Sequence, residues 1–120
     1  MAVCKWVDDG VPYVGETLRQ WLRQFYQENR LARGEFELEG QQVDLRSIRC
    51  PVLNIAGLKD AITPIAQARS TTELVSSSDK RLLLVDAGHP GMIVGPAGRP
   101  EMWRDMVSWL APRSQQLRPK

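Results

Sequence analysis

Two short apolar runs separated by a stretch of helical period constrain the fold of this chain more than any other feature. The first run covers residues 52–56 and is bounded by Gly57, and the second covers residues 82–85. Both are short and β-branched enough for buried strands. Between them, residues 64–74 leave room for a crossover helix, with Pro64 tolerated in its first turn. A strand, a crossover helix and a second strand form a parallel pair, so the sequence predicts an α/β fold.

An amphipathic helix is predicted ahead of this unit, over residues 17–33. Thr17 with Gln20 fits a capping box, and Gly34 supplies the left-handed position that ends a helix. Residues 36–39 then alternate apolar and acidic side chains, which favours a short, exposed, extended connector. The apolar side chains at helical spacing are Leu18, Trp21, Leu22, Phe25, Leu31 and Ala32.

A last amphipathic helix is predicted over residues 100–110, ended by Pro112. We therefore expect a helical arm over residues 1–45, a strand–helix–strand–helix segment over 46–112, and a frayed tail over 113–120. The predicted apolar face of the last helix consists of Met102, Trp103, Met106, Val107 and Leu110.

Composition excludes several classes of protein. The 120 residues allow one ordinary domain, and 42% hydrophobic with 25% charged residues is typical of a globular chain. The net charge is +2 and the charges are interspersed, so no nucleic-acid partner is expected. No apolar run approaches the roughly 18 residues that span a bilayer, and we expect a soluble, cytoplasmic protein without a transmembrane segment.

The two cysteines and the single histidine form no metal site. Cys4 and Cys50 are far apart, neither belongs to a Cys-x-x-Cys pair, and His89 stands alone. We expect free thiols and no bound metal. Cys4 has no flanking glycine and Cys50 lies between Arg49 and Pro51, so each is interpreted as structural rather than nucleophilic.

Asp60 and His89 are the candidate catalytic residues. Each follows the last residue of a predicted strand by four positions, and the carboxyl ends of parallel strands share one edge of the sheet. The two side chains can therefore meet. A carboxylate hydrogen-bonded to an imidazole fixes its tautomer and stabilises its cation, as in nucleophile–histidine–acid relays. Taken alone, such residues are more often a turn aspartate and a surface histidine, so the surrounding sequence decides.

Other charged residues near this pair are interpreted as structural or solvent-exposed. Asp86 precedes His89 by three positions, which suits a turn residue. The basic residues that could meet a coenzyme A phosphate are scattered, which is typical of ordinary surface charge; they are Lys59, Arg69, Lys80 and Arg81.

The segments around the pair resemble a known family. Residues 51–64, Pro-Val-Leu-Asn-Ile-Ala-Gly-Leu-Lys-Asp-Ala-Ile-Thr-Pro, and residues 86–92, Asp-Ala-Gly-His-Pro-Gly-Met, look like the last third of an α/β-hydrolase. More narrowly, they resemble the C-terminal part of poly(3-hydroxyalkanoate) synthases, and the Gly-His-x-Gly-Met run with the short end resembles the class III type. The arm is similar to that family's cap-to-core segment at Trp6, Asp8, Pro12, Gly15, Gln20, Trp21, Phe25, Tyr26, Asn29, Leu31 and Gly34.

The resemblance implies roles for individual residues. Asp60 would be the acid, and His89 the general base that activates a cysteine for acyl transfer from 3-hydroxyacyl-coenzyme A. Gly88 and Gly91 would let the histidine loop turn tightly, and Pro90 departs from the aliphatic residue expected there. The resemblance also implies no resident cofactor and association with polyester granules.

The family's nucleophile elbow, Gly-x-Cys-x-Gly, has no counterpart in these 120 residues, and its oxyanion hole belongs to the same missing part. We therefore expect a truncated synthase-like acyltransferase segment, inactive alone, whose two strands need sheet neighbours from a homodimer or a partner chain. Two alternatives stay open: a general α/β-hydrolase remnant, esterase or thioesterase, and a non-catalytic module that docks on a full-length synthase.

Overall fold

A computed structural model of the chain describes residues 9–10, 12, 14–93 and 100–114. The chain divides into two compact units, Met1–Asp44 and Leu45–Lys120. Each unit has its own secondary structure.

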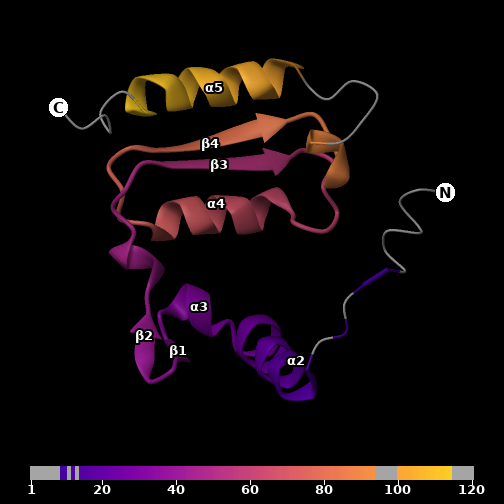
Figure 1. Cartoon of the computed structure of the whole chain (residues 1–120), viewed down its shortest axis with the longest axis vertical. Helices are drawn as coiled ribbons and strands as arrows, with labels where there is room; N and C mark the ends of the chain where they lie inside the picture. Colours follow the sequence, from indigo (N-terminus) through magenta and orange to yellow (C-terminus); the bar gives the residue numbers. More distant parts are fainter. Residues whose placement is uncertain (1–8, 11, 13, 94–99, 115–120) are drawn as a thin grey trace. The chain divides into compact units, whose positions relative to one another are not determined.

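The second unit is built on two parallel strands. β3 (Val52–Gly57) leads into α4 (Ile65–Leu74), which returns the chain to β4 (Lys80–Val85). The two strands pair along their whole length, with Val52 opposite Lys80 and Gly57 opposite Val85. The predicted strand–helix–strand unit is therefore confirmed, and the fold mixes helices and parallel strands as the sequence indicates (Figure 1).

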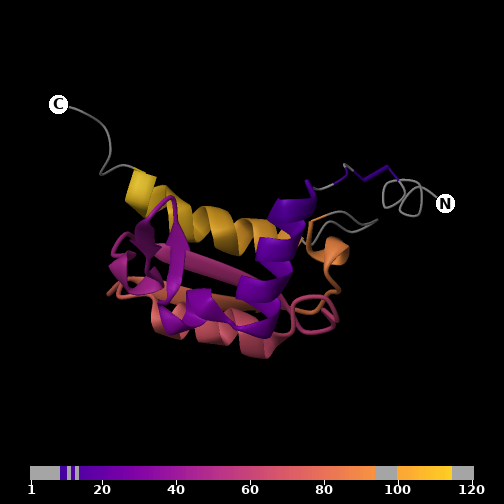
Figure 2. The same ribbon diagram turned by 90° about the horizontal axis from the view of Figure 1, so that it is seen from below.

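Helices cover both faces of this small sheet. Figures 1 and 2 show α4 on one face and α5 (Pro100–Ser114) on the other. On the α4 face, Asn54 Nδ2 donates hydrogen bonds to Ala68 O (2.8 Å) and Thr72 Oγ1 (3.1 Å). On the α5 face, apolar side chains form the core: Leu83, Val85, Ala87 and Met102 are buried, and Leu53, Ile55 and Met92 pack against them.

The C-terminal helix is longer than predicted and turns a different face inward. Pro112 lies inside α5 rather than ending it, and the helix includes the first two residues of the predicted frayed tail. The last turn is held by Arg113, which donates to the Trp109 carbonyl and makes two hydrogen bonds to Asp79. Met102 and Trp109 are buried and Met106 is half-buried, whereas Trp103, Val107 and Leu110 are exposed. The prediction of one apolar face was wrong, because the apolar side chains lie on two adjacent stripes of the helix and only one of these stripes is buried.

The predicted continuous helix of the first unit is interrupted. α2 (Gly15–Trp21) passes into a π-helical segment, Leu22–Gln27, and α3 (Arg30–Arg33) begins only after Asn29 adopts a left-handed φ of 49°. Glu28 bridges the break, because Arg23 Nε (2.7 Å) and Arg30 Nε (2.5 Å) both donate to its carboxylate. Asparagine tolerates the left-handed conformation. The spacing of the apolar residues does not show that the helix breaks at this residue.

The start of this helical stretch differs from the prediction, and its end agrees with it. α2 starts after Val14, which makes no side-chain capping bond, so the capping box predicted from Thr17 and Gln20 was wrong. Thr17 is already in the first helical turn. Gly34 ends α3 with φ of 70°, as predicted.

The predicted connector is one strand of a hairpin. β1 (Phe36–Leu38) pairs antiparallel with β2 (Gln41–Val43), and the two residues between them both have positive φ, 51° at Glu39 and 75° at Gly40. This is the geometry of a tight two-residue hairpin turn. Phe36 is buried, with its ring 4.8 Å from that of Phe25, so this end of the connector is not exposed.

Gly57 allows the carboxyl ends of the two parallel strands to approach closely. A Cβ added there would lie 2.4 Å from the Ala87 carbonyl oxygen, which is backbone and cannot move aside cheaply. We predict that Gly57→Ala lowers the free energy of unfolding by about 1–3 kcal/mol, the usual cost of overpacking. Urea unfolding followed by circular dichroism measures it.

The matched control is Gly15→Ala in α2, because nothing lies within 4 Å of a Cβ added at Gly15. It should leave stability unchanged or raise it slightly. Equal stability of Gly57→Ala and the unmodified chain would contradict the close contact.

Candidate functional site

The loop after β3 holds Asp60 in a fixed position. Its side chain is only 1% exposed. Oδ1 accepts hydrogen bonds from the backbone N–H groups of Ile62 (2.9 Å) and Thr63 (2.8 Å), which is an Asx-type turn. The Thr63 N–H bond lowers the pKa of Asp60 below its ordinary value, and the bonds from His89 and Ile62 act in the same direction against the effect of burial. Asp60 is therefore held as a carboxylate.

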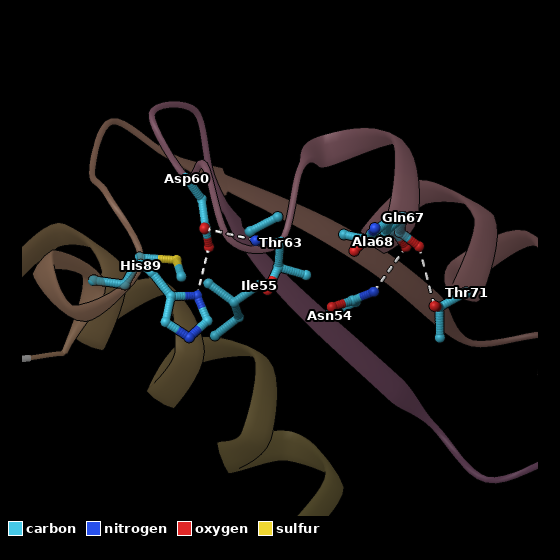
Figure 3. Close-up of a pocket in the computed structure, with 10 residues that line it drawn as sticks. Asn54, Ile55, Asp60, Thr63, Gln67, Ala68, Thr71 and His89 are labelled. Carbon is cyan, nitrogen blue, oxygen red and sulfur yellow. Dashed lines mark hydrogen bonds and ion pairs between the residues drawn. The ribbon is translucent and has the colours of Figure 1, made fainter. Parts of the chain in front are cut away.

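The loop after β4 brings His89 to this carboxylate. His89 Nδ1 lies 2.8 Å from Asp60 Oδ2 (Figure 3). An ionised carboxylate can only accept, so Nδ1 carries a proton, and in the neutral imidazole Nε2 then presents its lone pair. No residue in the described part of the chain hydrogen-bonds Nε2. The imidazole, 47% exposed, is thus oriented by a buried acid on one side and free to accept a proton on the other.

Backbone hydrogen bonds also join the loop after β3 to the loop after β4, independently of the contact between the Asp60 and His89 side chains. Leu58 N–H donates to the Val85 carbonyl (2.8 Å) and Lys59 N–H donates to the Ala87 carbonyl (3.1 Å). These bonds continue the strand pairing past the end of the sheet. The position of His89 relative to Asp60 is therefore set by the sheet register rather than by the side-chain bond alone.

The residue after the histidine starts a helical turn. Pro90 opens a short 3-10 segment, Pro90–Met92, which the Ile93 N–H closes by donating to the Pro90 carbonyl (3.1 Å). Proline is favoured at the first position of a helical turn because its missing N–H has no partner there anyway. The departure from an aliphatic residue at this position is therefore compatible with an ordered loop.

A groove of about 290 Å³ opens beside the pair. Asp60 and His89 line one end, α4 lines the other end through Gln67 and Thr71, and β3 forms the floor with Asn54 and its neighbours (Figure 3). The groove therefore has hydroxyl and amide groups in its wall and the imidazole at one end.

The other residues singled out from the sequence lie as follows. A Cβ on Gly88 or Gly91 would meet other atoms only at ordinary distances, 3.6 and 3.8 Å, so their role in supporting the loop stays a prediction. Asp86 is exposed and pairs with Lys59 (2.8 Å). Cys50 is an exposed free thiol at the amino end of β3, about 20 Å along the strand from the loop of Asp60. Cys4, Trp6 and Asp8 lie outside the described residues.

Three contributors to the site were not predicted from the sequence. They are Gly57, whose missing side chain lets the loops approach, Thr63, whose N–H holds Asp60, and Asn54, which ties β3 to α4. The Asp-x-x-Thr-Pro spacing before α4 is a usable signal for the Asx turn. A polar residue in the middle of an apolar strand is the signal for Asn54.

The described residues offer neither a metal site nor a membrane span. Within them, no three histidine, cysteine, aspartate or glutamate side chains come together to hold a metal ion. No helix among them has the length and apolar character needed to cross a bilayer.

A buried carboxylate and an oriented imidazole at the carboxyl edge of a parallel α/β unit have the geometry of the acid–histidine part of a nucleophilic relay. The chain belongs to the family described as PHB de-polymerase C-terminus, whose model matches residues 13–111.

The curated relatives are polymerases. The chain is 39% identical over 109 residues to the poly(3-hydroxyalkanoate) polymerase subunit PhaC of Allochromatium vinosum, covering 91% of this chain and 31% of that subunit. It is 35% identical over 111 residues to the PhaC subunit of Haloferax mediterranei, covering 92% and 23%. The predicted resemblance to polyhydroxyalkanoate synthases is confirmed. The chain spans about a quarter to a third of the length of these relatives.

The lowered pKa of Asp60 gives a pH dependence of stability with a defined sign. A carboxylate whose pKa is lower folded than unfolded stabilises the fold above its unfolded pKa, about 3.9, and loses this contribution as pH falls through the folded value. We predict that Asp60→Asn lowers Tm at pH 7 and that its difference from the unmodified chain shrinks below about pH 4. Thermal unfolding at pH 2.5–7 measures it.

Asp105→Asn, an exposed position on α5, is the control. Its Tm should follow that of the unmodified chain across the range. A Tm difference for Asp60→Asn that persists unchanged at pH 2.5 would show that the ionised carboxylate is not what stabilises the loop.

Proposed function

We propose that this chain is the acid- and base-bearing segment of a poly(3-hydroxyalkanoate) polymerase-like acyltransferase. The observation that carries the proposal is the hydrogen bond between buried Asp60 and His89, which leaves Nε2 free beside a groove. The relatives support it, because those with 33–39% identity over about nine-tenths of this chain are named polymerase subunits.

In this role His89 moves a proton. Nε2 would accept the proton of a cysteine thiol, and the thiolate would attack the thioester carbonyl of a 3-hydroxyacyl-coenzyme A. The imidazolium would return the proton to the departing coenzyme A thiolate, leaving the acyl group on the cysteine. Asp60 would stabilise the imidazolium while it exists.

The nucleophile and the oxyanion hole would come from outside this sequence. Neither cysteine of the 120 residues lies in a Gly-x-Cys-x-Gly turn, and the described one, Cys50, is at the opposite end of β3. We therefore propose that the chain alone releases no coenzyme A. The α/β-hydrolase arrangement, with this chain as the last part of the core, accounts for both the parallel unit and the missing elbow.

A hydrolase is the second candidate, favoured by the family's description as a polyhydroxybutyrate depolymerase C-terminus. The same acid and histidine serve hydrolysis when the nucleophile belongs to a serine or when water attacks the acyl intermediate. The two candidates differ in product, which is coenzyme A and polyester in one case and free hydroxy acid in the other.

A chimera tests the proposal. This chain would replace the matching 109 residues of the Allochromatium vinosum subunit, and release of coenzyme A from 3-hydroxybutyryl-coenzyme A would be measured. We predict activity in the chimera and a loss of about 10²–10⁴-fold with His89→Ala, the usual contribution of a general base. The Asp60→Asn variant should also lose activity.

The control is Asp86→Asn, the other carboxylate near the histidine, which pairs with Lys59 on the surface. It should keep the chimera's activity. A folded chimera in which His89→Ala is as active as the parent would refute the proposed role, and release of hydroxy acid from polyester without coenzyme A release from the thioester would favour the hydrolase.

A further inference from the structure

The two loops that carry Asp60 and His89 also carry exposed aliphatic side chains. Ile62 is 71% exposed on the loop after β3, where Leu58 is exposed as well, and Ile93 is 63% exposed on the loop after β4. Turn and loop positions in contact with water are more often occupied by polar residues, glycine or proline. Large aliphatic side chains gathered on both loops of the site therefore indicate an apolar ligand at this edge of the sheet.

Hydrogen bonds fix the backbone of Ile62 and Ile93 relative to the catalytic pair. Ile62 N–H donates to Asp60 Oδ1 (2.9 Å), and the other oxygen of this carboxylate holds the imidazole. Ile93 N–H donates to the Pro90 carbonyl (3.1 Å) and closes the turn that begins directly after His89. Isoleucine is branched at Cβ and has few side-chain rotamers. Little conformational entropy is therefore lost when a ligand covers these two side chains.

Ile62 and Ile93 border the end of the groove where the imidazole lies. Their sequence neighbours, Thr63 and Met92, line the groove together with His89, and Figure 3 shows Thr63 close to the pair. Ile62 and Ile93 are outside this lining and are exposed. They form the apolar rim of this end of the groove.

The charges on the two loops leave the apolar rim without a free ion of either sign. Lys59 and Asp86 pair with each other (2.8 Å). The Asp60 side chain is buried and bonded to the imidazole. Residues 58–64 and 86–93 contain no other aspartate, glutamate, lysine or arginine. The apolar rim therefore favours an uncharged aliphatic group over a carboxylate or a phosphate.

We propose that Ile62 and Ile93 are specificity-determining residues, which contact the aliphatic chain of the acyl group that His89 would help to transfer. The inference rests on the proposed function. Each methylene of the acyl chain that lies against apolar side chains strengthens binding by about fourfold. The apolar rim touches none of the reacting atoms. Its effect is on the choice among 3-hydroxyacyl thioesters, in favour of chains longer than butyryl.

The position of the apolar rim favours the acyl chain over a further polypeptide segment as its occupant. Ile62 and Ile93 come from the two loops that meet at the catalytic pair. A segment that covered both of them would also cover the imidazole, and Nε2 must stay open to the nucleophile and the thioester for acyl transfer. The acyl chain covers the apolar rim only while it is bound.

The chimera described under the proposed function tests the inference with two substrates. The kcat/KM values for 3-hydroxyhexanoyl-coenzyme A and 3-hydroxybutyryl-coenzyme A are measured, and their ratio is compared among variants. Ile62→Ala and Ile93→Ala should each lower the hexanoyl-to-butyryl ratio by about three- to tenfold, and Ile62→Leu should preserve it. The ratio does not depend on the fraction of folded enzyme, so a loss of stability alone leaves it unchanged.

Val107→Ala is the matched control, because Val107 is 57% exposed on α5, outside both loops of the site. It should leave the ratio unchanged. The inference is overturned if neither apolar-rim variant changes the ratio, or if Val107→Ala changes it as much as they do. Apolar-rim variants that lower Tm at a constant ratio would show that polypeptide, and not substrate, covers these side chains.

Titration calorimetry in the His89→Ala chimera separates this inference from the proposed function, because it measures binding without turnover. The Kd of the hexanoyl thioester should be lower than that of the butyryl thioester, and adding Ile62→Ala should reduce this difference by about three- to tenfold. Such a difference in a chimera whose His89 parent releases no coenzyme A would support the apolar rim and count against the proposed function. Coenzyme A release with equal Kd values would do the opposite.

Discussion

The contact between Gly57 and the Ala87 carbonyl is the constraint on which the rest of the site depends. It exists because β3 and β4 are parallel and in register to their last residues, and because Gly57 has no side chain. Two backbone hydrogen bonds then carry the pairing into the loops. This arrangement sets the separation of Asp60 and His89, so the geometry of the pair is a property of the sheet.

The chemistry of the site follows from the contrast in exposure between its two members. Asp60 is buried and its charge is satisfied by two backbone N–H groups and the imidazole. His89 is half-exposed and keeps Nε2 for another group. A fixed, ionised acid beside a histidine with a free Nε2 is the arrangement that the proposed role of His89 requires.

The sequence predicted the parts of the molecule that depend on apolar runs and on the proline and glycine residues that mark the ends of helices and strands. The β3–α4–β4 unit and the meeting of Asp60 with His89 followed from run lengths and a shared sheet edge. The break at Asn29 could not be predicted, because one left-handed residue leaves apolar spacing almost unchanged. The length of α5 could not either, since Arg113 holds the last turn through a contact with Asp79, distant in sequence.

The protonation state of His89 tests the central claim most directly. Nitrogen-15 NMR of the full chain, with the imidazole labelled, reports which ring nitrogen carries the proton near pH 8. The account predicts a protonated Nδ1 and an unprotonated Nε2, and loss of this preference in Asp60→Asn. A neutral imidazole protonated at Nε2, or a tautomer ratio that does not change in Asp60→Asn, would contradict it.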